Sequence, residues 1–360
     1  MKLCTIVNPG MEDLSKQEIK ELLAVSGKTY PHLVEFDTSA EQALTLLYHG
    51  QSMRRMMVSL GRCKNPDDLD FNSVAWKDFL SSSTSSSFKV EVENVKGIEN
   101  RLALAKKIAG KVFAAVDKQK LSLAIELKKP DFLLIVYCNG EEYFIGLDVA
   151  GEELHSRAYR VFTHSASCKG DLGYYFVRKT GYKPGDNLLV GFAKDGVTAV
   201  EAALYASKIP VHAAKNHFSY HKLPLFSRVK YVPLTPNVSV SIAAVDDSTQ
   251  NITAARKNAQ IAGVRKQLNI QKIILDELSG AFHEHEFDQV LFQVTTKDED
   301  KLNEIYHQVK YLLKPKGTLL LIGRESWEIS VPSYCKLISE EVQERGGNTY
   351  KLWLMMMGKK

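Results

Sequence analysis

The chain has 360 residues and a formal net charge of +5, and this length predicts about two or three domains. It has no run of about 18 uninterrupted apolar residues, which argues against a membrane-spanning helix. Its start, MKLCTIVNPG, lacks the apolar stretch and cleavage site of a secretory signal. Five scattered cysteines without CxxC spacing predict reduced thiols in the cytoplasm, and argue against a zinc site or disulfide framework.

Residues 1 to about 80 alternate between strand and helix patterns. The strand-like CTIV leads through an Asn-Pro-Gly turn into an amphipathic helix, NPGMEDLSKQEIKELLAV. HLVEF indicates a second strand, SAEQALTLLYHG a second helix that Ser39 can cap, and SMRRMMVSLGR a third strand. A small α+β module fits this alternation. The serine-rich residues 81–87 have no periodicity, so we expect a flexible joint and a domain boundary there.

Residues 88–155 predict a second small α+β unit. FKVEVEN alternates like a half-buried strand, residues 101–120 form a helix, and the segment after it contains three strands with a hairpin turn at Asn139-Gly140. The helix has an apolar stripe made of Leu104, Ile108, Val112 and Val116, which leaves its lysines, including Lys111 and Lys118, in solvent.

Cations are abundant in this second unit. Residues 88–120 carry eight basic and four acidic side chains, which a solvated helix face explains about as well as phosphate binding does. Further cations in the same module add weight to phosphate binding. The candidate RNA-binding residues are Arg101, Lys106, Lys107, Lys128, Lys129, Arg157 and Arg160.

Residues 155 to about 183 form a basic connector. Between residues 164 and 230 there are ten Lys or Arg against four acidic residues, interleaved with aromatic side chains. Aromatic and cationic groups side by side suit unpaired bases and their phosphates. A helix that buries its aromatic rings and exposes its lysines explains the pattern equally well. The rings concerned are Tyr174, Tyr175, Phe176, His217 and Tyr220.

Residues 184–360 predict an α/β doubly wound domain. NLLVGFA is a strand, VTAVEAALYASK a helix and PVHAAK a possible strand. After residues 241–276 come a strand, FDQVLFQV, a helix, DEDKLNEIYHQVKYLLKP, and a strand, GTLLLIG. VPSYCKLISEEVQERGG is expected to be a helix and TYKLWLMMM a closing strand.

Residues 241–276 form the clearest βαβ unit. An apolar strand over 241–245 ends in Asp246-Asp247, a helix with one apolar face closes at Gly263, and a second strand, residues 270–275, ends in Asp276. Ligands of such sheets lie beyond the carboxyl ends of the strands. An acidic residue there can accept hydrogen bonds from both hydroxyls of a ribose, so a nucleoside-type ligand is the first hypothesis. Asp246 and Asp276 can each equally be a turn residue at the end of a strand.

Three segments together resemble a known family. GEELHSRAYR, residues 151–160, and KVFAAVDKQKLSLAIELKKPDFLLIVY resemble the THUMP domain. The first 80 residues, with NPGMEDLSKQEIKEL, are similar to the ferredoxin-like module that accompanies it. VDDSTQNITAARKNAQIAGV resembles a nucleoside-contacting motif of the attached Rossmann-like methyltransferase. The resemblance implies four segments: 1–80 ferredoxin-like, 88–160 THUMP, 161–183 linker and 184–360 methyltransferase.

The resemblance also implies a function. The two amino-terminal modules would bind tRNA, or rRNA in some members. The Rossmann-like domain would transfer a methyl group from S-adenosylmethionine to the N2 amine of a guanine.

The family motifs imply particular site residues. Working members carry Asp-Pro-x-Cys-Gly-Ser-Gly-Thr before a Glu-Ala-Ala helix, where this chain reads VGFAKDGVTAVEAAL. Gly196 and Glu201 match, whereas Val190 replaces the first acid and Lys194 the first loop glycine. A lysine cannot leave that space open as glycine does, which predicts impaired cofactor binding. The cofactor-binding candidates are Gly196, Glu201, Asp246 for the ribose and Asp276 for the adenine.

The catalytic motif also departs from the family. Working members follow Phe-Asp and three strand residues with Asn-Pro-Pro-Tyr, which holds the target amine and stacks on the base. After Phe287-Asp288 this chain has Gln293 and then Val-Thr-Thr, so Gln293 is the catalytic candidate. Without the prolines and the ring, the loop is slack, and methyl transfer needs the amine within about 3 to 3.5 Å of the methyl group.

Two hypotheses therefore stay open. The first is an S-adenosylmethionine-dependent methyltransferase that acts on guanine in tRNA. The second is a catalytically inactive relative that still binds RNA and serves as a tRNA-binding or partner subunit. Whether the chain is an enzyme is left undecided.

Two other candidates have simpler explanations. His283, Glu284 and His285 have a spacing seen in metal sites, but a polar turn between two strands explains them better, so we expect no metal. Cys168 has no identified base partner that would make it a nucleophile.

Overall fold

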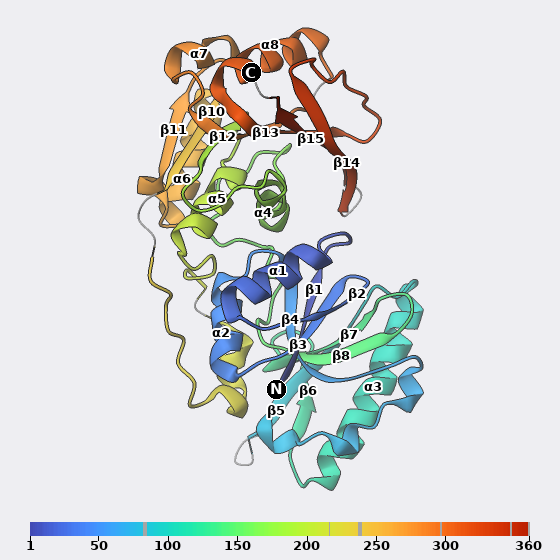
Figure 1. Ribbon diagram of the computed structural model, residues 1–360. Helices are drawn as coiled ribbons and strands as arrows, with labels where there is room; N and C mark the ends of the chain where they lie inside the picture. Colours follow the sequence, from blue (N-terminus) through green and yellow to red (C-terminus); the bar gives the residue numbers. More distant parts are fainter. Residues whose placement is uncertain (82–84, 216, 237–239, 296, 346–347, 359–360) are drawn as a thin grey trace. The chain divides into compact units, whose positions relative to one another are not determined.

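The chain divides into two compact units, each with its own sheet (Figure 1). Unit 1 contains residues 1–154 and 215–232, and unit 2 contains residues 155–214 and 233–360. The computed structural model describes residues 1–81, 85–215, 217–236, 240–295, 297–345 and 348–358. Among the helices of these residues, none has the length and apolar character needed to cross a membrane.

Unit 1 is built on one eight-stranded sheet with the order β2-β3-β1-β4-β8-β7-β5-β6. Its strands are β1 (Lys2–Val7), β2 (Lys28–Tyr30), β3 (Leu33–Asp37), β4 (Met53–Cys63), β5 (Ser86–Glu93), β6 (Leu123–Ile125), β7 (Phe132–Cys138) and β8 (Tyr143–Asp148). Its helices are α1 (Glu12–Leu23), α2 (Ala40–His49) and α3 (Ile98–Lys118), with short 3₁₀ helices η1 (Pro66–Asp68), η2 (Phe71–Ser73), η3 (Trp76–Asp78), η4 (Ser219–Lys222) and η5 (Pro224–Phe226).

The two predicted amino-terminal modules share this sheet. Strand β4 of the first pairs antiparallel with β8 of the second, for example Val58 with Leu147. Of the predicted serine-rich joint, residues 82–84 lie outside the described residues, and Ser86 and Ser87 already belong to β5. The chain therefore divides differently from the predicted boundary at 81–87. The ferredoxin-like and THUMP identities of the two segments stay predictions.

Residues 215–232 return to unit 1 and are held there by aromatic contacts. The ring of Tyr231 stacks on Tyr48 of α2 with centroids 4.0 Å apart, and the hydroxyls of Tyr48 and Tyr220 lie 3.3 Å apart. Lys215 Nζ lies 2.9 Å from Glu152 Oε1. This segment therefore belongs to unit 1, although unit 2 residues flank it in sequence.

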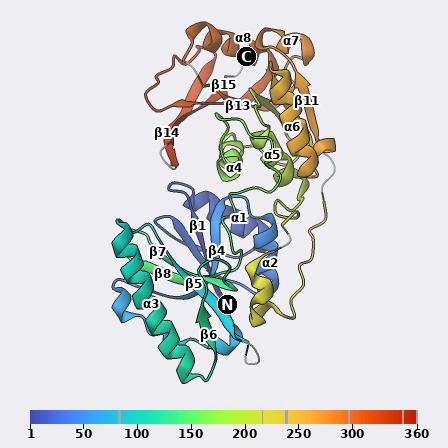
Figure 2. The ribbon, with the colours of Figure 1, turned by 180° about the vertical axis from the view of Figure 1, so that it is seen from behind.

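Helix α3 packs along β5 with the predicted apolar face (Figure 2). Ile108, Val112 and Val116 are buried, as the stripe predicts. Lys118 is exposed, as predicted, whereas Lys111 is half-buried, and both have partners among residues 66–72, before β5. Lys111 Nζ donates to the carbonyl oxygens of Pro66 and Asp67, and Lys118 Nζ donates to the side chain of Asn72 at 3.0 Å.

Unit 2 contains a seven-stranded sheet with the order β11-β10-β9-β12-β13-β15-β14. Its strands are β9 (Asn187–Gly191), β10 (Ser241–Asp246), β11 (Leu268–Lys272), β12 (Phe287–Gln293), β13 (Leu313–Arg324), β14 (Cys335–Arg345) and β15 (Asn348–Met357). Its helices are α4 (Gly170–Lys179), α5 (Val197–Ser207), α6 (Thr249–Ile261), α7 (Leu278–Ala281) and α8 (Glu299–Leu312), with 3₁₀ helices η6 (Arg265–Gln267) and η7 (Leu275–Glu277).

The sheet of unit 2 confirms the predicted doubly wound fold. Strands β11, β10, β9, β12 and β13 run parallel, and the antiparallel pair β15 and β14 continues the sheet at one edge. The chain winds from β9 to β11 in one direction and then crosses back to β12 on the other side of β9. The switch point between β9 and β12 is where such sheets place their ligands.

Two predicted elements of unit 2 are wrong. The helix expected over residues 331–347 is strand β14, although residues 346–347 lie outside the described residues. Its side chains alternate, with Leu337 half-buried and Ile338 exposed, and its backbone pairs with β15. This pairing overrides the helix preference of a segment rich in Glu and Gln. The possible strand PVHAAK is a turn at residues 211–214.

The predicted linker, residues 161–183, is part of unit 2 because it contains α4, which packs on α5. The aromatic rings of α4 are at most 4% exposed, so the buried-helix explanation holds for them and they are not available to stack on bases. Tyr220 in unit 1 is also buried. The buried rings of α4 are Tyr174, Tyr175 and Phe176.

Gly146 tests whether unit 1 is one cooperative sheet. A Cβ at this position in β8 would lie 2.6 Å from Val58 O and 2.7 Å from Met57 Cγ of β4. We therefore expect Gly146→Ala to destabilise unit 1 by about 1 to 3 kcal/mol. In hydrogen exchange, the amides of β1 and β7 should lose protection together.

Gly110→Ala in α3 is the matched control. A Cβ there meets nothing within 4 Å, so this change should stabilise the helix by up to about 1 kcal/mol. Loss of protection in β7 while β1 stays protected would mean that the two halves open independently, against this description.

Candidate functional site

The candidate site lies at the carboxyl ends of β9, β10 and β12. Gly191 ends β9, Asp246 ends β10 and Gln293 ends β12, and these strands are neighbours in the sheet. The sequence-predicted residues Asp246 and Gln293 are therefore brought to the same edge of the sheet. The loop from β9 to α5 contributes Lys194, Asp195 and Gly196.

Gly196 allows close packing at the start of α5. Its φ is +80°, a left-handed conformation that glycine adopts without a steric cost. A Cβ there would lie 2.8 Å from the Cβ of Ala255 on α6, closer than two carbons can approach. Glycine is therefore needed for the contact between α5 and α6, whatever its role toward a ligand.

The carboxylate of Asp246 is buried and accepts hydrogen bonds from the chain itself. Its Oδ2 accepts from the backbone N–H of Lys194 at 2.9 Å. Its Oδ1 accepts from the N–H of Ser248 at 3.0 Å and from Asn251 Nδ2 at 2.9 Å. Both carboxylate oxygens on which a ribose would depend thus already accept hydrogen bonds, from the loop after β9 and from the amino end of α6.

The Lys194 side chain is folded into the strand-end region and only 6% of the residue is exposed. Its Nζ donates to the carbonyl oxygen of Ala166 at 3.2 Å and to that of Gln293 at 3.4 Å. Burial lowers the pKa of Lys194 to about 8, although Cys168, Asp195 and Asp246 act to raise it. Near pH 7 this side chain is still mainly a cation.

Gln293, the catalytic candidate, is part of the same contact. Its side-chain Nε2 donates to the carbonyl oxygen of Ala166 at 3.3 Å, and its backbone carbonyl oxygen accepts from Lys194 Nζ. The last residue of the predicted catalytic motif, Thr296, lies outside the described residues. The amide of Gln293 is thus turned toward residues 160–168 of its own chain.

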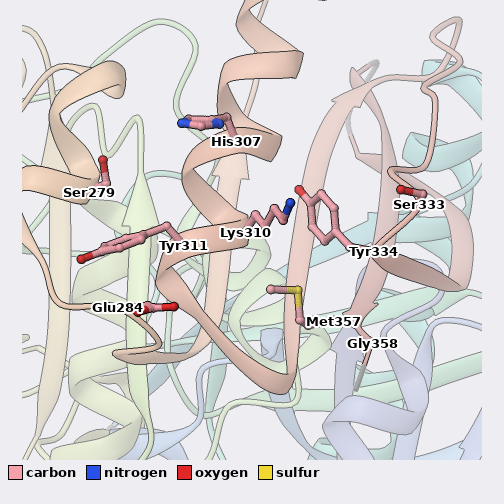
Figure 3. A pocket seen from close by; sticks show the side chains of 9 residues that line it. All are labelled: Ser279, Glu284, His307, Lys310, Tyr311, Ser333, Tyr334, Met357 and Gly358. Atoms are coloured by element: carbon pink, nitrogen blue, oxygen red, sulfur yellow. The ribbon is translucent and has the colours of Figure 1, made fainter. Parts of the chain in front are cut away.

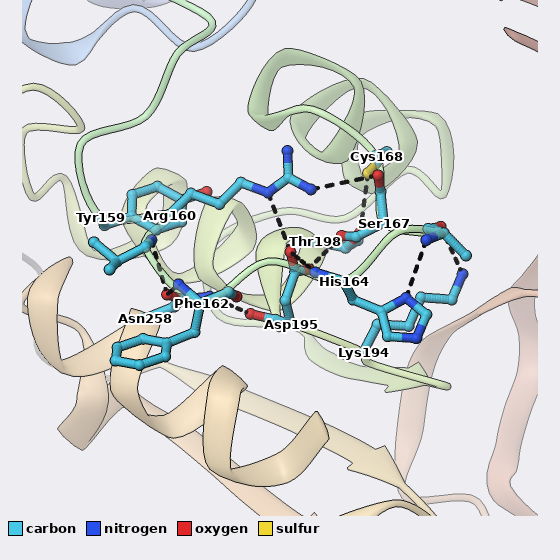
Figure 4. A network of polar contacts seen from close by, with 12 residues as sticks. Tyr159, Arg160, Phe162, His164, Ser167, Cys168, Lys194, Asp195, Thr198 and Asn258 are labelled. Carbon is cyan, nitrogen blue, oxygen red and sulfur yellow. Dashed lines mark hydrogen bonds and ion pairs between the residues drawn. The ribbon is translucent and has the colours of Figure 1, made fainter. Parts of the chain in front are cut away.

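A polar network fixes residues 160–168 against the loop after β9 (Figure 4). Asp195 is fully buried, and its Oδ2 accepts from Arg160 Nε at 3.1 Å and from the N–H of His164 at 3.3 Å. Its Oδ1 accepts from the hydroxyl of Ser167. Asn258 of α6 donates to the carbonyl oxygens of Phe162 and Asp195 at 2.8 and 2.9 Å.

Asp195 and Asn258 were not identified from the sequence. Their partners lie many residues away, as in the pairs Asn258 with Phe162 and Asp195 with Arg160, so no local pattern marks them. The sequence offered one indirect sign of Asp195, which lies between the two loop residues already considered, Lys194 and Gly196.

Glu201 lies on α5 in a buried ion pair. Arg157 Nε and Nη2 donate to its Oε1 and Oε2 at 2.8 and 3.0 Å, and the hydroxyl of Tyr159 donates to Oε1 at 2.7 Å. Both charged side chains are 0% exposed. Glu201 therefore anchors residues 157–159 to α5, and this geometry gives no sign of a direct cofactor contact.

Two of the predicted phosphate contacts do not fit this arrangement. Arg157 is enclosed and paired with Glu201, and the side chain of Arg160 is 13% exposed and paired with Asp195. Arg157 is buried and Arg160 is half-buried, and a guanidinium already paired with a carboxylate offers little to an RNA phosphate. We therefore correct the prediction and remove both arginines from the RNA-binding surface.

Asp276 is not at the end of a strand. Strand β11 ends at Lys272, and Asp276 lies four residues later in η7 with an exposed side chain. Its backbone carbonyl accepts from Gln308 Nε2 at 3.2 Å. The predicted strand over 270–275 was placed too late, because the apolar run continues beyond the paired residues.

The remaining RNA candidates lie in unit 1. Arg101, Lys106, Lys128 and Lys129 are exposed. Lys107 is also exposed, and its Nζ lies 2.5 Å from Asp67 Oδ1. Lys128 and Lys129 immediately precede Pro130, which lines a hollow of about 920 Å³ in this unit together with His217, His221 and Lys222.

Two hollows of unit 2 lie outside the strand-end cluster of Lys194, Asp246 and Gln293. One of about 660 Å³ lies near the amino ends of β12 and β13, where His307, Lys310 and Tyr311 of α8 line it with Tyr334 (Figure 3). The other, of about 810 Å³, lies beside the amino end of α6 and includes His164.

The predicted polar turn at residues 283–285 is held by contacts with the chain, among them a hydrogen bond between His285 Nδ1 and the carbonyl oxygen of Leu313 at 2.7 Å. His285 Nε2 lies 3.3 Å from Glu284 Oε1. Over the described ranges, no group of three or more His, Cys, Asp or Glu side chains could hold a metal ion. Cys168 is buried, and burial raises the pKa of its thiol to about 11, so it is not a reactive thiolate near neutral pH.

Comparison with known proteins supports a methyltransferase family. Residues 157–331 match the family model UPF0020, the RMKL-like methyltransferase domain. The chain is similar to the crystal structure of TrmN from Thermus thermophilus, with 19% identity, a TM-score of 0.70 and 99% of each chain covered.

Two further structures share the fold. SMU.472, a putative methyltransferase complexed with SAH, is 14% identical with a TM-score of 0.75, covering 100% of this chain and 98% of that one. A predicted N6-adenine-specific DNA methylase from Listeria monocytogenes is 16% identical with a TM-score of 0.73, covering 98% and 95%. At these identities the likeness shows the fold alone.

The residues at the strand ends do not fit S-adenosylmethionine, the methyl donor that the sequence resemblance implies. The Lys194 side chain lies between the carbonyls of Ala166 and Gln293, in the loop position where working members have glycine. The donor carries a positive sulfonium, which a buried ammonium repels. At the position of the missing acid, Val190 is 2% exposed in the middle of the sheet and offers no polar group.

The Arg157–Glu201 pair gives a direct test of unit 2. We expect Glu201→Gln to destabilise unit 2 by about 3 to 5 kcal/mol, because it removes the carboxylate that forms the buried bidentate ion pair with the guanidinium of Arg157. Urea unfolding monitored by circular dichroism measures the change.

The control is Glu341→Gln in the same unit. Glu341 pairs with Lys179 at 2.6 Å, but both side chains are about one-third exposed, so the loss should not exceed about 1 kcal/mol. Equal effects of the two substitutions would refute the structural role of Glu201.

Proposed function

We propose that this chain binds structured RNA through unit 1, with tRNA as the first candidate, and that its methyltransferase-like unit 2 does not transfer methyl groups. The single observation that carries the second half is the buried Lys194 at the ends of β9, β10 and β12. A side chain that is bonded to Ala166 and Gln293 leaves neither the space nor the charge that a sulfonium donor needs.

Support for RNA binding comes from the exposed cations of unit 1. Arg101 and Lys106 lie on the first half of α3, and Lys128 and Lys129 lie on the loop before β7. Phosphate contacts by such side chains supply most of the sequence-independent affinity for nucleic acids. We include rRNA as the other possible RNA, because the THUMP-like segments do not distinguish the two.

The second candidate function is S-adenosylmethionine-dependent methylation of the guanine N2 amine in tRNA. It is favoured by Asp246, which lies at the carboxyl end of β10 beside the switch point, and by Gly196 at the start of α5. In this case Asp246 would hold the ribose and Gln293 the target base. It requires Lys194 and Gln293 to leave their present partners.

Charge reversal at the loop before β7 tests RNA binding. Lys128→Glu combined with Lys129→Glu should weaken tRNA binding measured by fluorescence anisotropy. The plot of log affinity against log salt concentration should also become shallower by about 2, because two phosphate contacts are lost.

The matched control reverses two lysines of unit 2, Lys266→Glu with Lys316→Glu. Both are exposed near the amino ends of the parallel strands, so the net charge changes equally without touching the proposed surface. If the control pair weakens tRNA binding as much as the test pair, the surface is wrongly assigned. If the wild-type protein binds no tRNA, the first half of the proposal fails.

A methyl-transfer assay tests the second half. We expect the wild-type protein, at concentrations above that of a tRNA mixture lacking modifications, to transfer no tritium from labelled S-adenosylmethionine in single-turnover conditions. Incorporation of label that disappears in Asp246→Ala, with the label recovered as N2-methylguanosine after digestion of the tRNA, would instead support the second candidate function.

A further inference from the structure

Lys194 joins three segments that are far apart in sequence. It belongs to the loop after β9, its ammonium reaches Ala166 in residues 160–168, and it also reaches Gln293 at the end of β12. Its own backbone N–H binds Asp246 at the end of β10. One residue thus connects the parts of the chain that would have to separate to admit a ligand at this edge of the sheet.

The ammonium donates to carbonyl oxygens, which suits a cation enclosed by the chain. Asp195 and Asp246 lie close enough to raise its pKa, while burial and Lys301 lower it. Burying a charge is costly unless hydrogen bonds compensate it. Ala166 O accepts from both Lys194 Nζ and Gln293 Nε2. If the lysine were removed, the hydrogen bond from Gln293 to this carbonyl would remain.

We propose that the Lys194 side chain is an internal plug, which fills the strand-end site in place of a small ligand, and that its removal opens a site for an adenosine thioether. The inference rests on the proposed absence of methyl transfer and gives it a cause. The fold, Asp246 and Gly196 then remain as the frame of a nucleoside site that the chain occupies with its own side chain.

The backbone at this position favours a clean experiment. Lys194 has a φ of +53°, a left-handed conformation that costs a residue with a Cβ roughly 1 to 2 kcal/mol and costs glycine little. Lys194→Gly therefore removes the side chain and relieves the backbone at once. This gain offsets part of the lost hydrogen bonding, so the variant is expected to fold.

The experiment measures binding of S-adenosylhomocysteine, which is neutral at sulfur, by calorimetry with the full-length protein. The wild type should give no heat at millimolar ligand, and Lys194→Gly should bind at least about ten-fold more tightly than the wild type. Lys194→Met keeps an unbranched stem of the same length without the ammonium, and the site of this variant should stay closed. The ligand should raise the melting temperature of the glycine variant alone.

Lys257→Met is the control in the same unit. Lys257 Nζ lies 4.6 Å from the ring centroid of Phe162, and the side chain is exposed rather than inserted at the strand ends. This variant should behave like the wild type. Circular dichroism and urea unfolding show whether each variant is folded, and Lys194→Ala replaces the glycine variant if that one is not.

The outcomes separate the inference from the proposed function. A folded glycine variant that binds no better than the wild type overturns the plug, while tRNA binding and the absence of methyl transfer are measured separately. If S-adenosylhomocysteine binds Lys194→Met as tightly as Lys194→Gly, the plug is also contradicted, because the methionine side chain would then not fill the site. Tight binding by the wild type overturns both the plug and the proposed absence of donor binding.

Discussion

The hydrogen bonds of the buried Lys194 ammonium to Ala166 and Gln293 set the state of the strand-end site. A charge that is largely removed from water must find polar partners, and here it finds them on segments that would otherwise form the walls of a ligand site. The same residue occupies Asp246 through its backbone N–H. The polar groups expected of a nucleoside site therefore lie together, but they form hydrogen bonds with one another.

Unit 2 has sources of stability that need no ligand. The Arg157–Glu201 pair is fully buried, and Asn258 ties α6 to both Phe162 and Asp195. These contacts hold residues 157–168 in place against α5 and α6. The doubly wound fold of unit 2 can thus be kept as a scaffold without a bound donor, as the proposed function requires.

The sequence predicted what depends on local pattern and failed where distant contacts decide. The parallel strands and the position of Asp246 followed from apolar runs with polar ends, and both are observed. Strand β14 was predicted as a helix because its Glu and Gln residues favour one, and only pairing with β15 makes it a strand. Asp276 was misplaced because apolar residues continue past the end of β11. Arg157 looked like a phosphate contact because its buried partner, Glu201, is 44 residues away.

The most direct test of the closed strand-end site is nuclear magnetic resonance of the wild-type protein labelled with ¹⁵N. The amide signals of Lys194, Asp195 and Gly196 report on the loop after β9, whether or not any reaction occurs. On addition of S-adenosylmethionine to millimolar concentration, these signals should stay unchanged. Progressive, saturating shifts confined to this loop and to Asp246 would show that the donor binds there, and would contradict the account.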